Sequence, residues 1–155
     1  MRQFEIVNGV SGASYHRLLE FFASRAETYL FVVVNEAKIS EECRCFVDEL
    51  KSIGARAYYD NKWPGTTLLY GRKSLLIKGE LTPEVFELIL KKENALFSWR
   101  WPDSPEDLCL FDSRGDVLLS STTHECFASV MLDDEDLALW SKDELLSAIE
   151  LKPLK

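Results

Sequence analysis

The segment Tyr29–Val34, "YLFVVV", constrains the fold of this chain most strongly. All six residues are apolar, and the last three are valines. A helix or strand with one face in water would show polar residues at regular spacing, and none interrupts this run. A continuous, β-branched apolar run is typical of a strand that is buried on both faces. We therefore expect residues 29–34 to form the centre of a sheet that helices cover.

The residues around this run predict alternating strands and helices. Phe4–Val10 has the composition of a strand, and apolar residues recur at helical spacing over residues 15–26. Residues 40–54 predict a second helix, because Ser40 can cap its start and Gly54 can end it. Ala55–Tyr59 predicts a third strand. The order β-α-β-α-β favours right-handed crossovers and a parallel or mixed sheet.

The pattern changes after the loop Asp60–Gly65. Residues 66–78 predict one antiparallel hairpin around Gly71, and residues 108–121 predict another around Gly115. A helix is expected to begin at Thr82-Pro83, residues 126–132 predict a strand, and a last short helix is expected from Ser141 to Glu150. The predicted fold class is α+β, with a mixed sheet, an N-terminal βαβαβ part, antiparallel hairpins after it, and helices packed on the sheet. We expect a single domain over residues 1–155, and a two-lobed organisation around residues 60–65 stays open.

The charge balance limits the partners of the chain. Its 155 residues include 26 acids against 18 Lys and Arg, which gives a net charge of −8 and a pI near 4.8. Such a surface repels nucleic acid and suits a basic protein partner. No apolar run reaches the ~18–20 residues that span a bilayer, and no secretory leader is recognisable at the N-terminus. We therefore expect a cytoplasmic protein without nucleic-acid or membrane partners, whose four cysteines are free thiols.

The stretch Ser120–Phe127, "SSTTHECF", is the one place where catalytic residue types gather. A thiol nucleophile needs an imidazole within hydrogen-bond reach, so Cys126 and His124 are the candidate catalytic pair. On a strand these two residues would share a face, with Cys126 packed inward as part of the core. The spacing matches no metal-binding motif, although Cys109 could approach His124 and Cys126 across neighbouring strands. We expect a strand edge here, with no catalytic residues, no metal and no cofactor.

The turn Gly9–Ser14 is a second position where a ligand could bind. It follows a strand and precedes a helix, and helix N-termini bind anions. The glycine patterns of the known phosphate loops are absent. A ligand pocket beside Gly9–Ser14 therefore remains an alternative.

Aromatic and acidic residues provide the candidate binding surface. Trp63 lies in a loop, and Trp99 and Trp101 are predicted to share one face of a strand, either as core or as an exposed interface. The acidic run consists of Asp133, Asp134, Glu135 and Asp136. It precedes a helical pattern, where acids favour the helix N-terminus, and it is also a candidate contact for a basic partner.

The run Asp107–Trp140 resembles small bacterial proteins, mostly uncharacterised, with an Asp-x-x-Gly turn between apolar strands, a Ser…His-Glu segment and an acidic helix start. As a small, acidic α+β protein the chain is also similar in style to bacterial toxin-immunity proteins, which implies a basic toxin as partner. The leading hypothesis is a non-enzymatic protein-binding module, including an immunity-type inhibitor. The alternatives are a small enzyme with a Cys126/His124 site or a pocket near Gly9–Ser14, and a homo-oligomer that associates through a sheet edge or an aromatic face.

Overall fold

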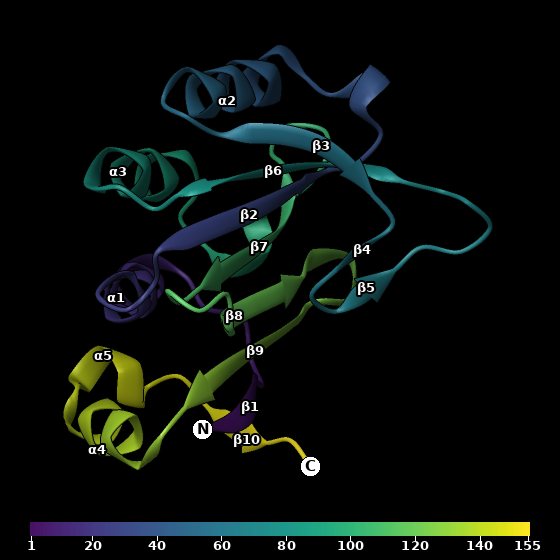
Figure 1. Ribbon diagram of the computed structural model, residues 1–155. Coiled ribbons are helices and arrows are strands. Elements are labelled where there is room, and N and C mark those ends of the chain that lie inside the picture. Colours follow the sequence, from purple (N-terminus) through teal and green to yellow (C-terminus); the bar gives the residue numbers. More distant parts are fainter.

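The computed structural model describes residues 1–155 as one eight-stranded sheet, a separate two-stranded hairpin and five helices (Figure 1). The strands of the large sheet are β1 (Arg2–Ile6), β2 (Thr28–Val33), β3 (Arg56–Asp60), β6 (Ser74–Glu80), β7 (Glu106–Phe111), β8 (Val117–Thr122), β9 (Phe127–Leu132) and β10 (Leu151–Pro153). The hairpin consists of β4 (Lys62–Trp63) and β5 (Thr66–Thr67). The helices are α1 (Gly12–Ala23), α2 (Glu41–Ser52), α3 (Pro83–Lys92), α4 (Asp134–Lys142) and α5 (Glu144–Ser147).

The predicted α+β class is confirmed, but the predicted mixed sheet is wrong. The strand order is β10-β1-β9-β8-β7-β2-β6-β3, and all seven pairs of neighbours are antiparallel. Following these pairs across the sheet shows that β1, β2 and β3 run in the same direction, as a βαβαβ order requires. They never lie side by side, because β6 separates β2 from β3 and three later strands separate β1 from β2. Strands from both sides of residues 60–65 therefore belong to one sheet.

Strand β2 is buried on both faces, as its sequence predicts. Tyr29, Phe31 and Val33 belong to the main core together with residues of all the longer helices. Leu30 and Val32 face the other way, into a smaller apolar cluster that Trp63 of the β4–β5 hairpin completes. Figure 1 shows the helices on one side of the sheet and this hairpin on the other. The second face is therefore covered by a hairpin, where the sequence suggested helices.

Trp99 lies at the centre of the main core. Its ring centroid lies 4.6 Å from that of Phe31 and 5.5 Å from that of Phe46, and its Nε1–H donates to Tyr15 Oη at 2.9 Å. Burial raises the pKa of Tyr15, so this phenol stays protonated as the partner of Trp99. Trp99 is fully buried, and the expectation that it belongs to a binding surface is wrong.

The predicted strand through Trp99 and Trp101 is also wrong. Residues Leu96–Ser98 form a 3₁₀ turn, which rotates the chain so that Trp99 points inward while Trp101 remains 39% exposed. Alternating apolar residues over so short a segment did not distinguish a strand from a turn that anchors one tryptophan.

Two further elements differ from the sequence expectation. β5 pairs with β4, so residues 66–78 do not form a hairpin, and β6 instead lies between β2 and β3. The last helical region begins at Asp134, and Asp133 and Asp136 form its capping box. The acidic run thus opens a helix, as the sequence indicated, but the separate helix start predicted at Ser141 is wrong, because α5 is capped by Asp143. None of the helices combines the length and the apolar character that crossing a membrane requires.

The two neighbouring tryptophans allow a direct test of this core. We expect Trp99→Ala to lower the free energy of unfolding by about 3–5 kcal/mol, because it leaves a cavity between three aromatic rings. Trp101→Ala, at the exposed neighbour, should cost less than about 1 kcal/mol. Urea titrations of both variants measure the difference. Similar losses in the two variants would contradict the placement of Trp99.

Candidate functional site

The C-terminal helical segment concentrates the negative charge of the protein. Residues 133–150 hold seven carboxylates and one lysine, a formal charge of −6 against −8 for the whole chain. They form α4, the joint at Asp143 and the short helix α5, which pack beside α1. The acidic surface foreseen from residues 133–136 is therefore part of a larger one.

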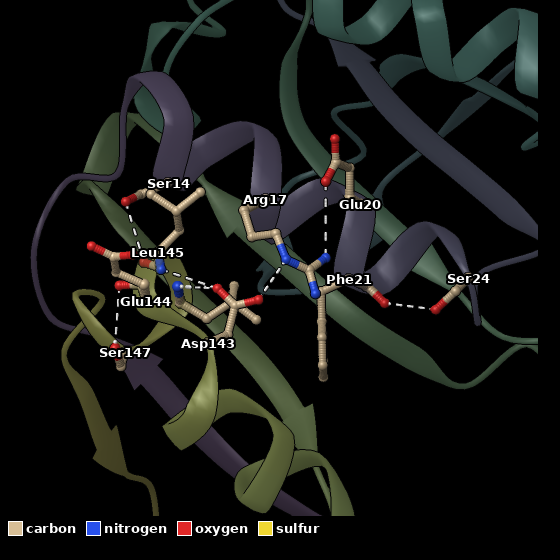
Figure 2. Close-up of polar contacts among 10 residues, drawn as sticks. Ser14, Arg17, Glu20, Phe21, Ser24, Asp143, Glu144, Leu145 and Ser147 are labelled. Carbon is tan, nitrogen blue, oxygen red and sulfur yellow. Dashed lines mark hydrogen bonds and ion pairs between the residues drawn. The ribbon is translucent and has the colours of Figure 1, made fainter.

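Asp143 fixes this segment against α1 (Figure 2). Its Oδ2 accepts a hydrogen bond of 2.7 Å from Arg17 Nε, and its Oδ1 accepts the backbone N–H groups of Leu145 and Leu146 that open α5. Ser14 of α1 donates to the carbonyl of Leu145. The backbone N–H of Leu146, followed by Arg17, holds the pKa of Asp143 below its usual range. α1 and α5 are thus joined by polar contacts that favour the ionised carboxylate.

Two members of the acidic run have structural roles. Asp133 and Asp136 accept each other's backbone N–H groups at the start of α4. The Asp136 carboxylate is buried and forms an ion pair with Arg25, whose guanidinium lies over the ring of Phe21. The expectation that Asp136 contacts a partner is wrong, because its side chain is used inside the fold.

The other acids of this segment remain at the surface. Asp134 is exposed and pairs with Arg2 at 2.6 Å, and an exposed ion pair of this kind contributes little to stability. Glu135 and Glu144 are exposed and form no ion pair with Lys or Arg. These carboxylates are free to interact with positive charge on another molecule.

Apolar surface lies among these charges. A hollow of about 460 Å³ opens between α1 and α4 and is lined by Arg17, Glu20, Phe21, Ser24, Arg25, Leu139, Lys142 and Asp143. Leu139 is 49% exposed and Leu145 is 38% exposed. We call the exposed residues Asp134, Glu135, Leu139, Glu144 and Leu145, together with this hollow, the α4–α5 face. The exposed acids and leucines belong to the same helical segment, and the lining of the hollow also holds Arg17, Arg25 and Lys142. The leucines were not singled out from the sequence.

A second group of chemically active residues surrounds Asp107 at the start of β7. The side chain of Asp107 is almost fully buried. Its Oδ2 accepts the Nε1–H of Trp63 at 2.9 Å, and its Oδ1 accepts the backbone N–H of Thr123 at 2.8 Å. One oxygen each of Glu106 and Asp107 and one ring nitrogen of His124 lie within 4.8 Å of one another. We call Glu106, Asp107 and His124 the Asp107 cluster.

The expected strand edge at residues 120–127 is only partly correct. β8 ends at Thr122, and Thr123–Glu125 form a 3₁₀ turn, so His124 and Cys126 do not share a strand face. Cys126 has a φ of 50° and is exposed, which contradicts the expectation that it packs inward. Its Sγ accepts a hydrogen bond from Arg100 at 3.1 Å and none from His124. The side chains therefore do not form the proposed thiol–imidazole pair.

Trp63 is a structural residue of the β4–β5 hairpin. It is buried against the second face of the sheet, so the expectation that it forms part of a binding surface is wrong. The following turn needs glycine, because Gly65 has a φ of 84° and a Cβ there would lie 2.7 Å from Thr122 Oγ1. Of the three tryptophans proposed for binding, only Trp101 remains substantially exposed.

The turn Gly9–Ser14 forms a hollow of about 220 Å³ with residues 148–150. Glu150 is the one charged residue among those that line it, which disfavours an anion. One of the backbone N–H groups of the first turn of α1, that of Gly12, already donates to the carbonyl of Asn94 at 2.8 Å. This geometry gives the phosphate hypothesis no support.

The charge of Asp143 should make stability depend on pH. Its folded-state pKa is depressed below the unfolded value of about 3.9, so its contribution is present above that pH and is lost as the pH falls through the folded pKa. Asp143→Asn keeps a capping group but removes the charge. We expect its melting temperature to lie below that of the wild type at neutral pH, and the difference to shrink below about pH 4. A difference that is constant with pH would contradict the Arg17–Asp143 contact.

The four thiols should react in two classes. Cys45 and Cys126 are exposed, whereas Cys43 and Cys109 are buried, and burial raises the pKa of Cys43 to about 11 and that of Cys109 to about 12. The thiolate is the reactive form. We expect iodoacetamide at neutral pH to modify Cys45 and Cys126 in the folded protein and all four residues in denaturant, as read by peptide mass spectrometry. Protection of Cys126 in the folded protein would contradict the turn at Thr123–Glu125.

Comparisons with known proteins connect the chain to no known family. No protein-family model matches it, and no curated protein or solved structure is significantly similar to it. The residues and their geometry are therefore the basis for inferring its function.

Proposed function

We propose that the protein is a non-enzymatic protein-binding module that docks a basic partner through the α4–α5 face. The observation that carries this proposal is the position of two exposed leucines, Leu139 and Leu145, within a segment whose formal charge is −6. Surface carboxylates steer a basic partner toward the face, and the leucines supply apolar area that becomes buried on contact. An immunity-type inhibitor of a basic toxin would be one protein of this kind.

The rigidity of the face supports the same proposal. α5 is tied to α1 through the Arg17–Asp143 and Ser14–Leu145 contacts, and α4 is tied through Asp136 to Arg25, which follows the end of α1. A face that is already ordered loses little conformational entropy when a partner binds.

The enzyme alternative has less support. Catalysis by Cys126 requires a base within hydrogen-bond reach, and its sulfur contacts Arg100 instead of His124. The hollow beside Gly9–Ser14 has no free cationic group for a phosphate. We therefore favour binding as the function.

The proposal predicts which substitutions weaken partner binding. Immobilised wild-type protein is used to capture a partner from a lysate of its host at low salt, and the partner is then purified for affinity measurements. We expect Leu139→Ala with Leu145→Ala to weaken binding at least ~10-fold, because each leucine loses buried apolar area. Glu135→Gln with Glu144→Gln should weaken binding by up to ~10-fold and make it less dependent on salt.

A matched control separates the α4–α5 face from overall charge. Asp48→Asn with Glu49→Gln removes the same number of negative charges, two, but from the exposed side of α2. This control should bind the partner as the wild type does. Equal losses from the two charge variants, or full binding by the double-leucine variant, would refute the face as the docking site.

A further inference from the structure

The Asp107 cluster brings together three potential metal ligands from the start of β7 and the turn after β8. Glu106 and Asp107 begin β7, and His124 lies in the turn that follows β8. β7 and β8 pair antiparallel, so the start of one lies beside the end of the other. One potential ligand atom from each residue falls within a mutual distance of 4.8 Å.

The charge of Asp107 is not compensated inside the protein. Asp107 makes no ion pair with Lys or Arg, and its two oxygens accept hydrogen bonds from an indole and a backbone amide. Arg100 is close by, but its guanidinium donates to Thr123 O and Cys126 Sγ rather than to a carboxylate of the cluster. A buried carboxylate without a positive partner is costly, and metal coordination is one of the ways in which proteins compensate it.

Hydrogen bonds orient the two carboxylates of the cluster, as they do in most metal sites. Ligating carboxylates in proteins are themselves hydrogen-bonded, which fixes their orientation. Trp63 and the backbone of Thr123 orient Asp107, and the backbone N–H of Trp101 donates to Glu106 Oε2 at 2.8 Å. Each carboxylate oxygen keeps a second lone pair that could face an ion.

We propose that Glu106, Asp107 and His124 bind a divalent transition-metal ion. Two carboxylates and one imidazole suit Zn²⁺, Co²⁺ or Mn²⁺, and three protein ligands leave room in the coordination sphere for water. With metal–oxygen and metal–nitrogen bonds of about 2.0–2.2 Å, two ligand atoms of one ion lie at most about 4.4 Å apart, close to the 4.8 Å limit within which these atoms lie. The His124 side chain is 62% exposed, and its Nε2 lies 3.7 Å from Glu125 Oε1, so metal binding through this nitrogen would replace an exposed contact.

A Co²⁺ titration tests this site. Visible absorption and isothermal calorimetry of the full chain should show one bound Co²⁺, and Zn²⁺ should displace it. His124→Gln and Glu106→Gln should each weaken binding at least ~100-fold, more than the loss of an orienting residue usually causes. Trp63→Phe, which removes only the hydrogen bond to Asp107, should weaken binding ~10-fold.

Two controls make the assignment specific. His16→Gln changes the one other histidine, and Cys126→Ser removes the exposed thiol near the site, so both should bind Co²⁺ as the wild type does. Circular dichroism establishes that each variant is folded. Absence of one-to-one binding at ~1 mM Co²⁺, Zn²⁺ or Mn²⁺ would overturn the proposal, since functional sites bind far more tightly. Unchanged affinity in His124→Gln, or loss of affinity in Cys126→Ser alone, would also overturn it.

Discussion

The hydrogen bond from Trp63 to Asp107 connects the parts of this structure that the main core does not hold together. Trp63 covers the second face of the sheet, over Leu30 and Val32, and its Nε1–H reaches the buried Asp107 carboxylate. The same carboxylate accepts the backbone N–H of Thr123, which fixes the turn that carries His124. One buried charge therefore positions both the hairpin and the proposed metal ligands, while the α4–α5 face depends on separate contacts with α1.

The local sequence predicted which helices and strands form better than it predicted which strands lie side by side in the sheet. The two-sided burial predicted for residues 29–34 is present over residues 29–33, although Val34 lies beyond β2 and is exposed. The turn around Gly115 follows from its turn residues and is also present. The βαβαβ order correctly implies that β1, β2 and β3 run in one direction. It carries no information about strands inserted between them, because β6 and β9 reach their places through contacts distant in sequence. An antiparallel sheet could not be recognised from the first sixty residues.

The candidate sites show the same limit. The acidic start of α4 is visible in the sequence. Only the fold shows that the Asp136 carboxylate forms a buried ion pair with Arg25 and that Leu139 is exposed. Tryptophan is a residue type that is common in interfaces, but tertiary packing buries both Trp63 and Trp99. The Asp107 cluster had a usable signal. The turn around Gly115 brings the start of β7 beside the end of β8, near His124. The exact register was not predictable, because a shift between Leu110 and Phe111 pairs Cys109 with Ser120.

Amide hydrogen exchange in Trp63→Phe measures most directly whether the contact between Trp63 and Asp107 organises this side of the molecule. Phenylalanine keeps most of the apolar ring and removes the donor to Asp107. We predict that residues 62–68 and the Thr123 amide exchange faster in the variant, while the core amides of α1, α2 and α3 keep their protection. Unchanged protection of residues 62–68 would contradict the central role of this hydrogen bond.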